Sequence, residues 1–382
     1  MRIRPTEAVV DLAAIVRNYE LARQVGGRPA IAVVKANAYG HGVVPVARAV
    51  VQAGCPMLAV ALVEEGIELR EAGIAAPVLV LGGAYGERYE LLVRHRLTPL
   101  VFREDQVIAL GEAARQLGTS AAAHVKLDTG MGRIGLQPRE LGAFMAVARA
   151  ARGVRIEGVC THFASADLVP RDVTERQVQA FDGAADALVA EGFPIRFRHL
   201  ANSAGTIEFP AARQDLTRPG IMLYGLLPFG PGDVLTAAAA TVGGALSPAL
   251  SWKTAITHVK TVPAGTAISY GGRWTAERTS RIATLPVGYA DGYPRRLSGR
   301  PGFGRAEVLV RGRRAPVAGT VCMDMMMADV TDVPGADVGD EVMLLGVQGD
   351  QRISADELAE RAGTISYEIL CGIGHRVPRR YV

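Results

Sequence analysis

The sequence predicts a two-domain α/β protein, in which an N-terminal (β/α)8 barrel is followed by a C-terminal, mainly antiparallel β domain. Three observations support this prediction. The chain has 382 residues, more than a single hydrophobic core usually accommodates. Its first part alternates short apolar runs with stretches of helical spacing, as parallel βα units do. From about residue 236 the pattern changes to alternating, β-branched runs that are typical of antiparallel strands.

The barrel is predicted from eight apolar runs. These candidate strands are residues 30–35, 57–61, 78–81, 98–102, 123–127, 156–161, 197–200 and 220–223. The clearest amphipathic helices between them are residues 11–25, 104–117 and 139–151. In the first of these helices, Leu12, Ile15 and Tyr19 share one face. Eight βα units favour a barrel, although the same local pattern also fits an open doubly wound sheet.

The β domain is predicted to follow a loop rich in Gly, Pro and Ala at residues 228–248. Its candidate strands are residues 255–262, 281–287, 307–310, 314–317, 326–330 and 341–345. A last helix is predicted to start at Ser354, with Glu357 in the capping-box position, and to end near Arg361. We therefore expect a barrel at residues 8–238 and a β domain at residues 239–382, with residues 1–7 as a candidate addition to the β domain.

The composition argues against a membrane protein, a nucleic-acid-binding protein and a metal site. No apolar run approaches the roughly 20 residues that cross a bilayer, and the N-terminus lacks the apolar segment of a signal peptide, so we expect a cytoplasmic protein. The net charge is +4, but the 42 basic residues are dispersed and form no long stripe. The four cysteines lie far apart without metal-ligand spacing, and we expect reduced thiols.

Polar residues follow several predicted barrel strands, at the edge where barrel enzymes carry their catalytic groups. Lys35 closes the first run, where burial would lower the pKa of its amine and favour a Schiff base; for an isolated lysine, a surface position at a strand end is the more common case. Lys126 and Arg133 flank a Gly-rich turn, which fits a polar site and a solvated loop equally well. His162 could stack on a planar ring, although a lone histidine is more often a hydrogen-bonded core residue.

The loops around the seventh and eighth runs could hold a phosphate group. The Ser203 hydroxyl and the N–H groups of Gly220 and Ile221 would suit a dianion, and Gly220 allows close approach of the backbone. Asn-Ser and Pro-Gly pairs are also ordinary turns. In the β domain, Tyr270 and Tyr289 lie beside glycines, which most often indicates hairpins. No signal is specific alone, but a lysine, a phosphate cradle and an isolated tyrosine together indicate pyridoxal-phosphate (PLP) chemistry.

Together, the motifs resemble those of the alanine racemase family. The matching stretches are AVVKANAYGHG (32–42), KLDTGMGRIG (126–135), THFASAD (161–167), HLANSAG (199–205), RPGIMLYGLLP (218–228), ISYGG (268–272), LPVGYADGYPR (285–295), VAGTVCMDMM (317–326) and YEILCGIGHRVPRRY (367–381). They span nearly the whole chain in the family's order. The lysine motif is highly specific for PLP attachment in this family, and GYADG and CMD are specific to its β domain.

The resemblance implies a head-to-tail homodimer in which the β domain of one subunit completes the active site of the other. Lys35 would carry PLP, and the residues that would hold the cofactor are Tyr39, His162, Asn202, Ser203, Arg218, Gly220, Ile221 and Tyr367. His162 would lie against the pyridine ring, and Arg218 would face its nitrogen. From the partner subunit, Tyr270 would be the second base and Met323 would contact the substrate carboxylate, together with Arg133. The residues that would surround the site or narrow its entrance are Lys126, His199, Tyr289, Asp324, Asp167 and Arg295.

These roles suit racemisation, which removes the α-proton from one face and returns a proton to the other. Lys35 and Tyr270 would supply the two bases, and Arg133 the positive charge that a phenolate needs. Arg218 would offer the ring nitrogen a donor that cannot give up its proton, which limits transamination. In this family Lys126 is often carbamylated, which would place an anion beside Arg133.

The sequence therefore predicts a PLP-dependent racemase that interconverts L-alanine and D-alanine and supplies D-alanine for peptidoglycan. A racemase of serine, or one of broader amino-acid specificity, remains an alternative. A PLP barrel decarboxylase is a second, against which Arg218 argues. A non-catalytic PLP carrier made of the barrel alone is a third, against which the motifs of the β domain argue.

Overall fold

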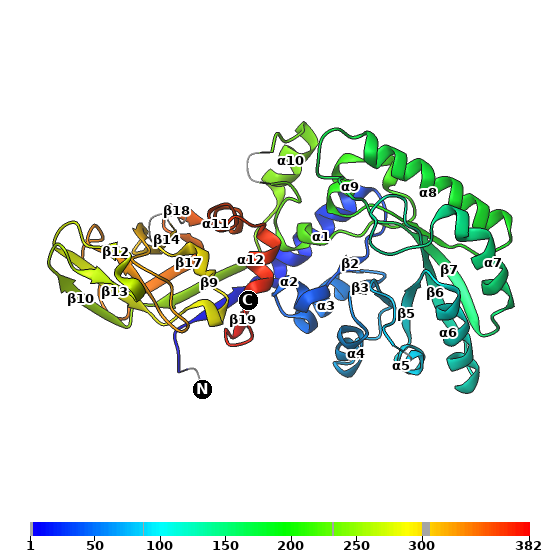
Figure 1. Ribbon diagram of the computed structural model, residues 1–382, viewed down its shortest axis with the longest axis horizontal. Helices are drawn as coiled ribbons and strands as arrows, with labels where there is room; N and C mark the ends of the chain where they lie inside the picture. Colours follow the sequence, from blue (N-terminus) through cyan, green and yellow to red (C-terminus); the bar gives the residue numbers. More distant parts are fainter. Residues whose placement is uncertain (1–2, 87, 231–232, 300–305) are drawn as a thin grey trace.

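The computed structural model describes residues 3–86, 88–230, 233–299 and 306–382, which form two domains (Figure 1). One is built of parallel strands with helices around them, and the other mainly of antiparallel strands. In Figure 1 the domains lie side by side along the long axis, and α1 (Leu12–Gly26) and α12 (Ser366–Gly372) lie where they meet. The predicted fold class, a barrel followed by a β domain, is confirmed. No helix within these ranges is long and apolar enough to span a bilayer.

The barrel sheet has seven parallel strands within the described residues, arranged in chain order. They are β2 (Ala32–Val33), β3 (Leu58–Val60), β4 (Val78–Val80), β5 (Leu97–Val101), β6 (Ala121–Lys126), β7 (Val154–Cys160) and β8 (Phe197–His199). Each overlaps one of the predicted runs, so the first seven strand predictions are confirmed. Most strand residues are buried, apart from the starts of β7 and β8, because side chains fill the barrel interior and helices cover its outside.

The eighth predicted strand, residues 220–223, is wrong. Ile221–Tyr224 form a short 3₁₀ helix, η3, and the preceding residues take the eighth position in the barrel wall. Thr217 bridges to Ala30, and its carbonyl accepts from the Ile31 N–H at 2.8 Å. On the other side the Arg218 N–H donates to the Ala201 carbonyl at 2.8 Å. The Pro219 carbonyl still accepts from the Val33 N–H at 3.2 Å, but Pro219 has no N–H to donate in return.

The helices that cover the barrel include all three that the sequence predicts. These are α1, α6 (Glu104–Gln116) and α7 (Leu141–Ala150). The other barrel helices are α3 (Val43–Gln52), α4 (Val63–Glu71), α5 (Tyr89–Arg94), α8 (Asp172–Ala190), α9 (Ser203–Glu208) and α10 (Ala237–Ala245). Through Ala239 and Val242, α10 packs on Ala22 and Ile207 of the barrel. Because α10 crosses the predicted boundary at residue 238, we propose that the β domain begins after this helix.

The β domain contains a large mixed sheet and two smaller ones. Its strands after the barrel are β9 (Leu250–Ala255), β10 (His258–Val262), β11 (Ala267–Ile268), β12 (Trp274–Thr275), β13 (Ser280–Leu285), β14 (Glu307–Val310), β15 (Arg313–Pro316), β16 (Met326–Asp329), β17 (Glu341–Gln348), β18 (Gln351–Ile353) and β19 (Arg379–Tyr381). All six predicted runs contain strand residues. The predicted last helix is α11 (Ala355–Ala362), where the Ser354 hydroxyl accepts from the Glu357 N–H at 3.0 Å.

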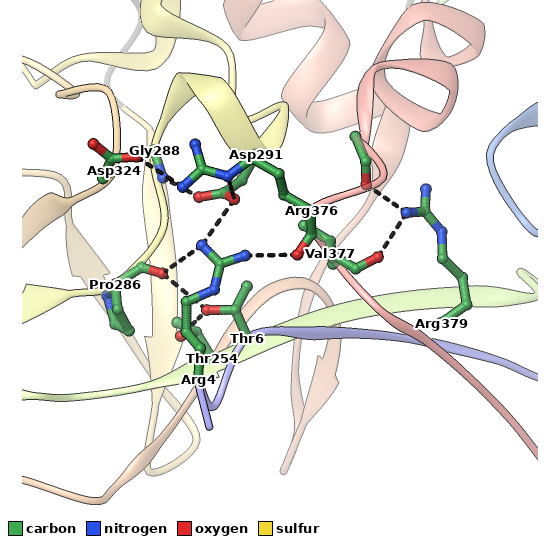
Figure 2. A network of polar contacts seen from close by, with 11 residues as sticks. Arg4, Thr6, Thr254, Pro286, Gly288, Asp291, Asp324, Arg376, Val377 and Arg379 are labelled. Atoms are coloured by element: carbon green, nitrogen blue, oxygen red, sulfur yellow. Dashed lines mark hydrogen bonds and ion pairs between the residues drawn. The ribbon is translucent and has the colours of Figure 1, made fainter. Parts of the chain in front are cut away.

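Both ends of the chain lie in the large sheet of the β domain. Strand β1 (Glu7–Val10) pairs antiparallel with β9 and parallel with β19. Figure 2 shows how Arg4 reinforces this arrangement: its guanidinium donates to the buried Asp291 carboxylate at 2.8 Å and to the Arg376 carbonyl at 2.9 Å. Of the predicted addition at residues 1–7, the first two residues lie outside the described part of the chain, and the rest approach the β domain.

Candidate functional site

A cavity of about 290 Å³ lies at the carboxyl ends of the barrel strands. All residues that the sequence predicts to hold the cofactor line it, together with Lys126 and Arg133. Its described lining contains the four cationic side chains Lys35, Lys126, Arg133 and Arg218, and no carboxylate. A cavity with this charge suits a ligand that carries more than one anionic group.

Lys35 is held at the mouth of the barrel by a left-handed turn directly after β2. The four residues 36–39 have positive φ angles of 51–53°, which cost roughly 1–2 kcal/mol each in L-residues. Three hydrogen bonds support the turn: the Ala38 N–H donates to the Val34 carbonyl at 2.9 Å, the Val43 N–H to the Asn37 side chain at 2.8 Å, and the Ala36 N–H to the Glu65 carboxylate at 2.5 Å. The surrounding structure thus stabilises a strained turn, and this turn fixes the position of the adjacent lysine.

The amine of Lys35 is prepared for nucleophilic chemistry. Burial is the main cause that lowers the pKa of Lys35, and the nearby Arg133 lowers it further. The Glu65 carboxylate acts in the opposite direction. A lower pKa leaves more of the amine neutral near pH 7, and the neutral amine is the form that attacks a carbonyl carbon.

Hydroxyl and amide donors converge at the other end of the cavity. The Ser203 hydroxyl accepts from the Gly220 N–H at 3.0 Å, and a Cβ at Gly220 would lie 2.5 Å from the Tyr39 hydroxyl oxygen. The Asn202 side chain caps α9 by accepting from the Gly205 N–H at 2.8 Å. Two hydroxyls and an amide around a position that only glycine can occupy form a cradle for phosphate oxygens. The cofactor implied by the sequence therefore fits this cavity.

Arg218 is almost completely buried and bound to backbone carbonyls of the barrel rim. One guanidinium nitrogen, Nη2, donates to the carbonyls of Thr161 and Leu200 at 2.7 and 2.9 Å. The other, Nη1, lies 2.9 Å from His199 Nδ1 and also donates to the His199 carbonyl. In the described part of the chain, Nε has no acceptor. The side chain is thus rigidly held with one N–H left for a ligand.

The imidazoles of the site are neutral. Burial, and then the positive charge of Arg218, hold the pKa values of His162 and His199 well below the ordinary value. A neutral His162 at the cavity wall can lie against an aromatic ring without adding charge. A neutral His199 can accept a hydrogen bond from Arg218.

Lys126 and Arg133 lie at the two ends of the Gly-rich loop after β6. Lys126 donates to the Leu127 carbonyl at 2.8 Å, and burial lowers its pKa to about 8. The loop is shaped by the Asp128 carboxylate, which accepts from the N–H groups of Gly130 and Met131 at 3.0 and 2.9 Å. This carboxylate explains how the loop turns sharply and brings Arg133 back over the cavity.

Tyr270, Met323 and Tyr289 do not reach the cavity of their own chain. They lie on the surface of the β domain, with Tyr270 71 % and Met323 52 % exposed. Neighbouring loops present them: the Thr320 hydroxyl donates to the Tyr270 carbonyl at 3.2 Å, and the Tyr289 N–H donates to the Cys322 carbonyl at 3.0 Å. Within one chain, therefore, Tyr270 is not brought together with Lys35.

The remaining predicted residues lie around these two surfaces. Asp324 forms an ion pair with Arg376 at 2.8 Å, which belongs to the network around Asp291 (Figure 2). Arg295 is exposed on the β domain, in the short helix η6 (Arg295–Leu297). Asp167 is exposed on the barrel rim, and it raises the pKa of Tyr367, for which burial is the larger cause.

Sequence reasoning missed three residues around the site. The Tyr224 ring stacks on Tyr39, with centroids 4.7 Å apart, and its hydroxyl donates to the Val33 carbonyl at 2.9 Å. Glu65 follows the second barrel strand, and a carboxylate after a strand end was a signal that could have identified it. His124 lies inside the barrel against His199. A histidine in the middle of a predicted buried strand was the signal that could have identified His124.

Comparisons with known proteins cover the whole chain. Residues 10–228 match the family described as "Alanine racemase, N-terminal domain", and residues 249–381 match "Alanine racemase, C-terminal domain". The chain is 48 % identical to an alanine racemase of Halothermothrix orenii, over 99 % of this chain and 97 % of that protein. It is 45 % identical to one of Geobacter sulfurreducens, over 100 % and 98 %.

Solved structures agree with these relatives. An alanine racemase from Streptomyces lavendulae superposes with a TM-score of 0.92 at 36 % identity, covering 100 % of this chain and 98 % of that chain. An alanine racemase from Bacillus anthracis with bound L-Ala-P superposes with a TM-score of 0.90 at 38 % identity, covering 100 % and 96 %. Both domains and their arrangement are therefore similar in these proteins and in this chain.

Proposed function

Because this chain belongs to the alanine racemase family, we propose that it is a PLP-dependent enzyme that interconverts L-alanine and D-alanine. The cavity at the barrel mouth carries this proposal. It combines the amine of Lys35, the donors around Ser203 and Gly220, and a lining without carboxylates in its described part. Such a lining matches a cofactor phosphate at one end and a substrate carboxylate at the other.

The residues of the cavity have distinct tasks toward the cofactor. Tyr39, Ser203, Gly220 and Ile221 hold the phosphate with hydroxyl and amide donors, with Tyr367 beside them. Lys35 is the point of covalent attachment. When bound, PLP supplies the electron sink that makes the α-proton of an attached amino acid acidic.

Two bases on opposite faces move the proton. Lys35 acts on one face, because its lowered pKa allows the amine to accept and return a proton near neutral pH. Tyr270 acts on the other face from a second subunit, because in its own chain it is exposed and remote from the cavity. Arg133 supplies the positive charge that favours a phenolate, and with Met323 it binds the substrate carboxylate.

Arg218 restrains the reaction type. Its guanidinium is fixed by the rim carbonyls and by His199, with only Nε free among its nitrogens in the described structure. An arginine donates a hydrogen bond to the pyridine nitrogen but does not transfer its proton. Arg218 would thus keep the ring of a bound PLP unprotonated, so that it would be a weaker electron sink, which would limit side reactions such as transamination.

The same residues support a proposal for how two subunits assemble and for the compartment in which the enzyme works. A head-to-tail homodimer would bring Tyr270, Met323 and Tyr289 of each chain to the cavity of the other. With a pKa of about 8, Lys126 has a neutral fraction that can react with carbon dioxide to form a carbamate and a proton. The four cysteines are free, which agrees with a reducing cytoplasm, where D-alanine would be made for peptidoglycan.

The direct test is a panel of single enantiomers, each incubated with the purified enzyme and PLP. Circular dichroism should show L-alanine and D-alanine each converging to the racemic mixture. Serine and larger amino acids should react more slowly. Absence of alanine racemisation by a PLP-loaded dimer would contradict the proposal. Faster turnover of serine than of alanine would mean that the enzyme is a racemase whose substrate is serine.

A further inference from the structure

A second buried histidine lies behind the contact between Arg218 and His199. His124 Nδ1 lies 2.8 Å from His199 Nε2, and His199 Nδ1 lies 2.9 Å from the Arg218 guanidinium. Both imidazoles are fully buried. His124 does not line the cavity, so it can affect the reaction only through His199 and Arg218.

The barrel wall is shaped to accept the His124 ring. His124 on β6 pairs with Gly158 on β7. A Cβ on Gly158 would lie 2.5 Å from His124 Nδ1, closer than any side-chain carbon can approach. A residue larger than glycine at position 158 would therefore displace the imidazole from His199.

An irregularity in the same strand pair turns a carboxylate toward His124. Ala123 pairs with Ile156 and His124 with Gly158, so Glu157 is the extra residue of a β-bulge. Arg155 holds one oxygen of this carboxylate at 3.0 Å, and the other oxygen lies 4.0 Å from His124 Nε2. Among the described residues, His124 Nε2 has no hydrogen-bond partner.

The contacts require one arrangement of protons. A guanidinium only donates, so His199 Nδ1 must accept from Arg218. Burial lowers the pKa of His124 to about 3 and, as for His199, keeps the ring neutral, so each imidazole carries one N–H. His199 must then carry its proton on Nε2 and donate to His124 Nδ1. His124 in turn carries its proton on Nε2, toward the negative charge of Glu157.

We propose that His124, oriented by Glu157, is a positioning residue that fixes the His199 tautomer and thereby the Arg218 guanidinium. The inference rests on the proposed function, because Arg218 matters there as the donor to the pyridine nitrogen. Without an acceptor at position 124, His199 can carry its proton on Nδ1. In that tautomer the His199 Nδ1–H faces an N–H of Arg218, and the two donors repel each other. This repulsion moves the guanidinium away from the pyridine nitrogen.

The test compares two substitutions of similar shape. His124→Asn keeps an acceptor oxygen near the position of Nδ1, and His124→Leu removes it. In protein labelled with ¹⁵N-histidine and free of cofactor, the wild type and His124→Asn should show His199 protonated on Nε2. His124→Leu should show a mixture or the Nδ1-protonated form. Gly158→Ala should resemble His124→Leu, whereas Gly183→Ala, where a Cβ meets open space, should match the wild type.

Kinetics give a second measurement that a merely structural role would not change. His124→Leu should lower kcat for alanine racemisation by about tenfold, a loss of one buried hydrogen bond, and raise the number of transaminations per racemisation. His124→Asn, which keeps the acceptor, should have a kcat and a number of transaminations per racemisation close to those of the wild type. An unchanged His199 tautomer in His124→Leu would overturn the inference, whether or not the enzyme racemises alanine. A wild type without alanine turnover would refute the proposed function alone, because the tautomer is observed without substrate.

Discussion

The Cβ that Gly220 lacks would lie 2.5 Å from the hydroxyl oxygen of Tyr39. This distance makes the glycine a condition for the cradle that Ser203 completes. Gly220→Ala must push the Tyr39 phenol away or shift the backbone whose N–H donates to Ser203. Hydrogen bonds to charged groups contribute about 1.5–3 kcal/mol, so we expect PLP to bind about 10- to 100-fold more weakly. Titration of the cofactor-free protein with PLP measures this change.

Gly244→Ala is the matched control for that experiment, because a Cβ at Gly244 meets open space. It should bind PLP as the wild type does. Equal PLP affinity in both variants would show that the cradle lies elsewhere.

Lys35 directly precedes the strained turn at residues 36–39, and Lys35→Ala removes its amine from the cavity. We expect Lys35→Ala to lose the visible absorbance that attached PLP gives the enzyme, and to lose alanine racemisation. Absorbance spectra of protein passed through a desalting column measure retention of the cofactor. Lys260→Ala, on the exposed strand β10, should keep both properties. A coloured, active Lys35→Ala protein would disprove the attachment.

Tyr270→Phe removes one hydroxyl from the surface of the β domain. If this phenol is the second base, racemisation should fall by about 10²–10⁴-fold, the usual contribution of a general acid or base. Deuterium exchange at the α-carbon should continue on the face served by Lys35. Tyr85→Phe, on an exposed tyrosine of the barrel, is the control. Near-normal rates in both directions would exclude the role.

Arg218→Glu tests how the enzyme restrains its chemistry. A carboxyl group facing the pyridine nitrogen can transfer a proton and strengthen the electron sink. Pyruvate formed from alanine per racemisation should rise at least about tenfold, a shift of about 1.4 kcal/mol between the two barriers. Arg218→Lys keeps a cation there and should change this ratio less. An unchanged ratio in Arg218→Glu would contradict the account.

The lowered pKa of Lys126 should make the stability of the folded protein depend on pH. The pKa of this amine falls from 10.5 to about 8 on folding, mainly through burial. Below pH 8 both states hold the proton and the folded state bears the full cost, at most about 3 kcal/mol. Between pH 8 and 10.5 the unfolded state binds more protons, so the free energy of unfolding rises with pH.

Lys126→Met lacks this cost, so its stability advantage over the wild type should shrink as the pH rises from 8 to 10. Urea unfolding in buffer free of carbon dioxide measures the difference and excludes carbamylation. A difference that stays constant over this range would mean that the buried amine does not titrate there.

The sequence predicted best those elements whose structure depends on neighbouring residues in the chain, such as strands and helix caps. The apolar runs predicted seven barrel strands, and Ser354 with Glu357 predicted the start of α11. The eighth strand was missed because the apolar run that forms the 3₁₀ helix η3 has the same composition as a buried strand. Only the hydrogen bonds of Thr217 and Arg218 show which residues close the barrel.

The sequence predicted which residues line the site, but it did not predict the backbone conformations that position them. The motifs named the residues that line the cavity, because each follows a strand end or a glycine. They did not reveal the left-handed turn after Lys35, because among residues 36–39 only Asn37 is of a type that favours positive φ. Nor did they reveal His124, whose meaning depends on a bulge in a neighbouring strand.

Strand β1 lies between β9 and β19, so the first and last strands of the protein are neighbours in one sheet (Figure 1). The barrel is thus an insertion within the β domain. During synthesis β1 leaves the ribosome before the barrel does, but it has no partner strand until the whole barrel has been made. The barrel can therefore become compact while translation continues, and the large sheet of the β domain is completed only when β9 and β19 have been made. A circular permutant that joins β19 to β1 through a linker and opens the chain between α10 and β9 would remove this delay.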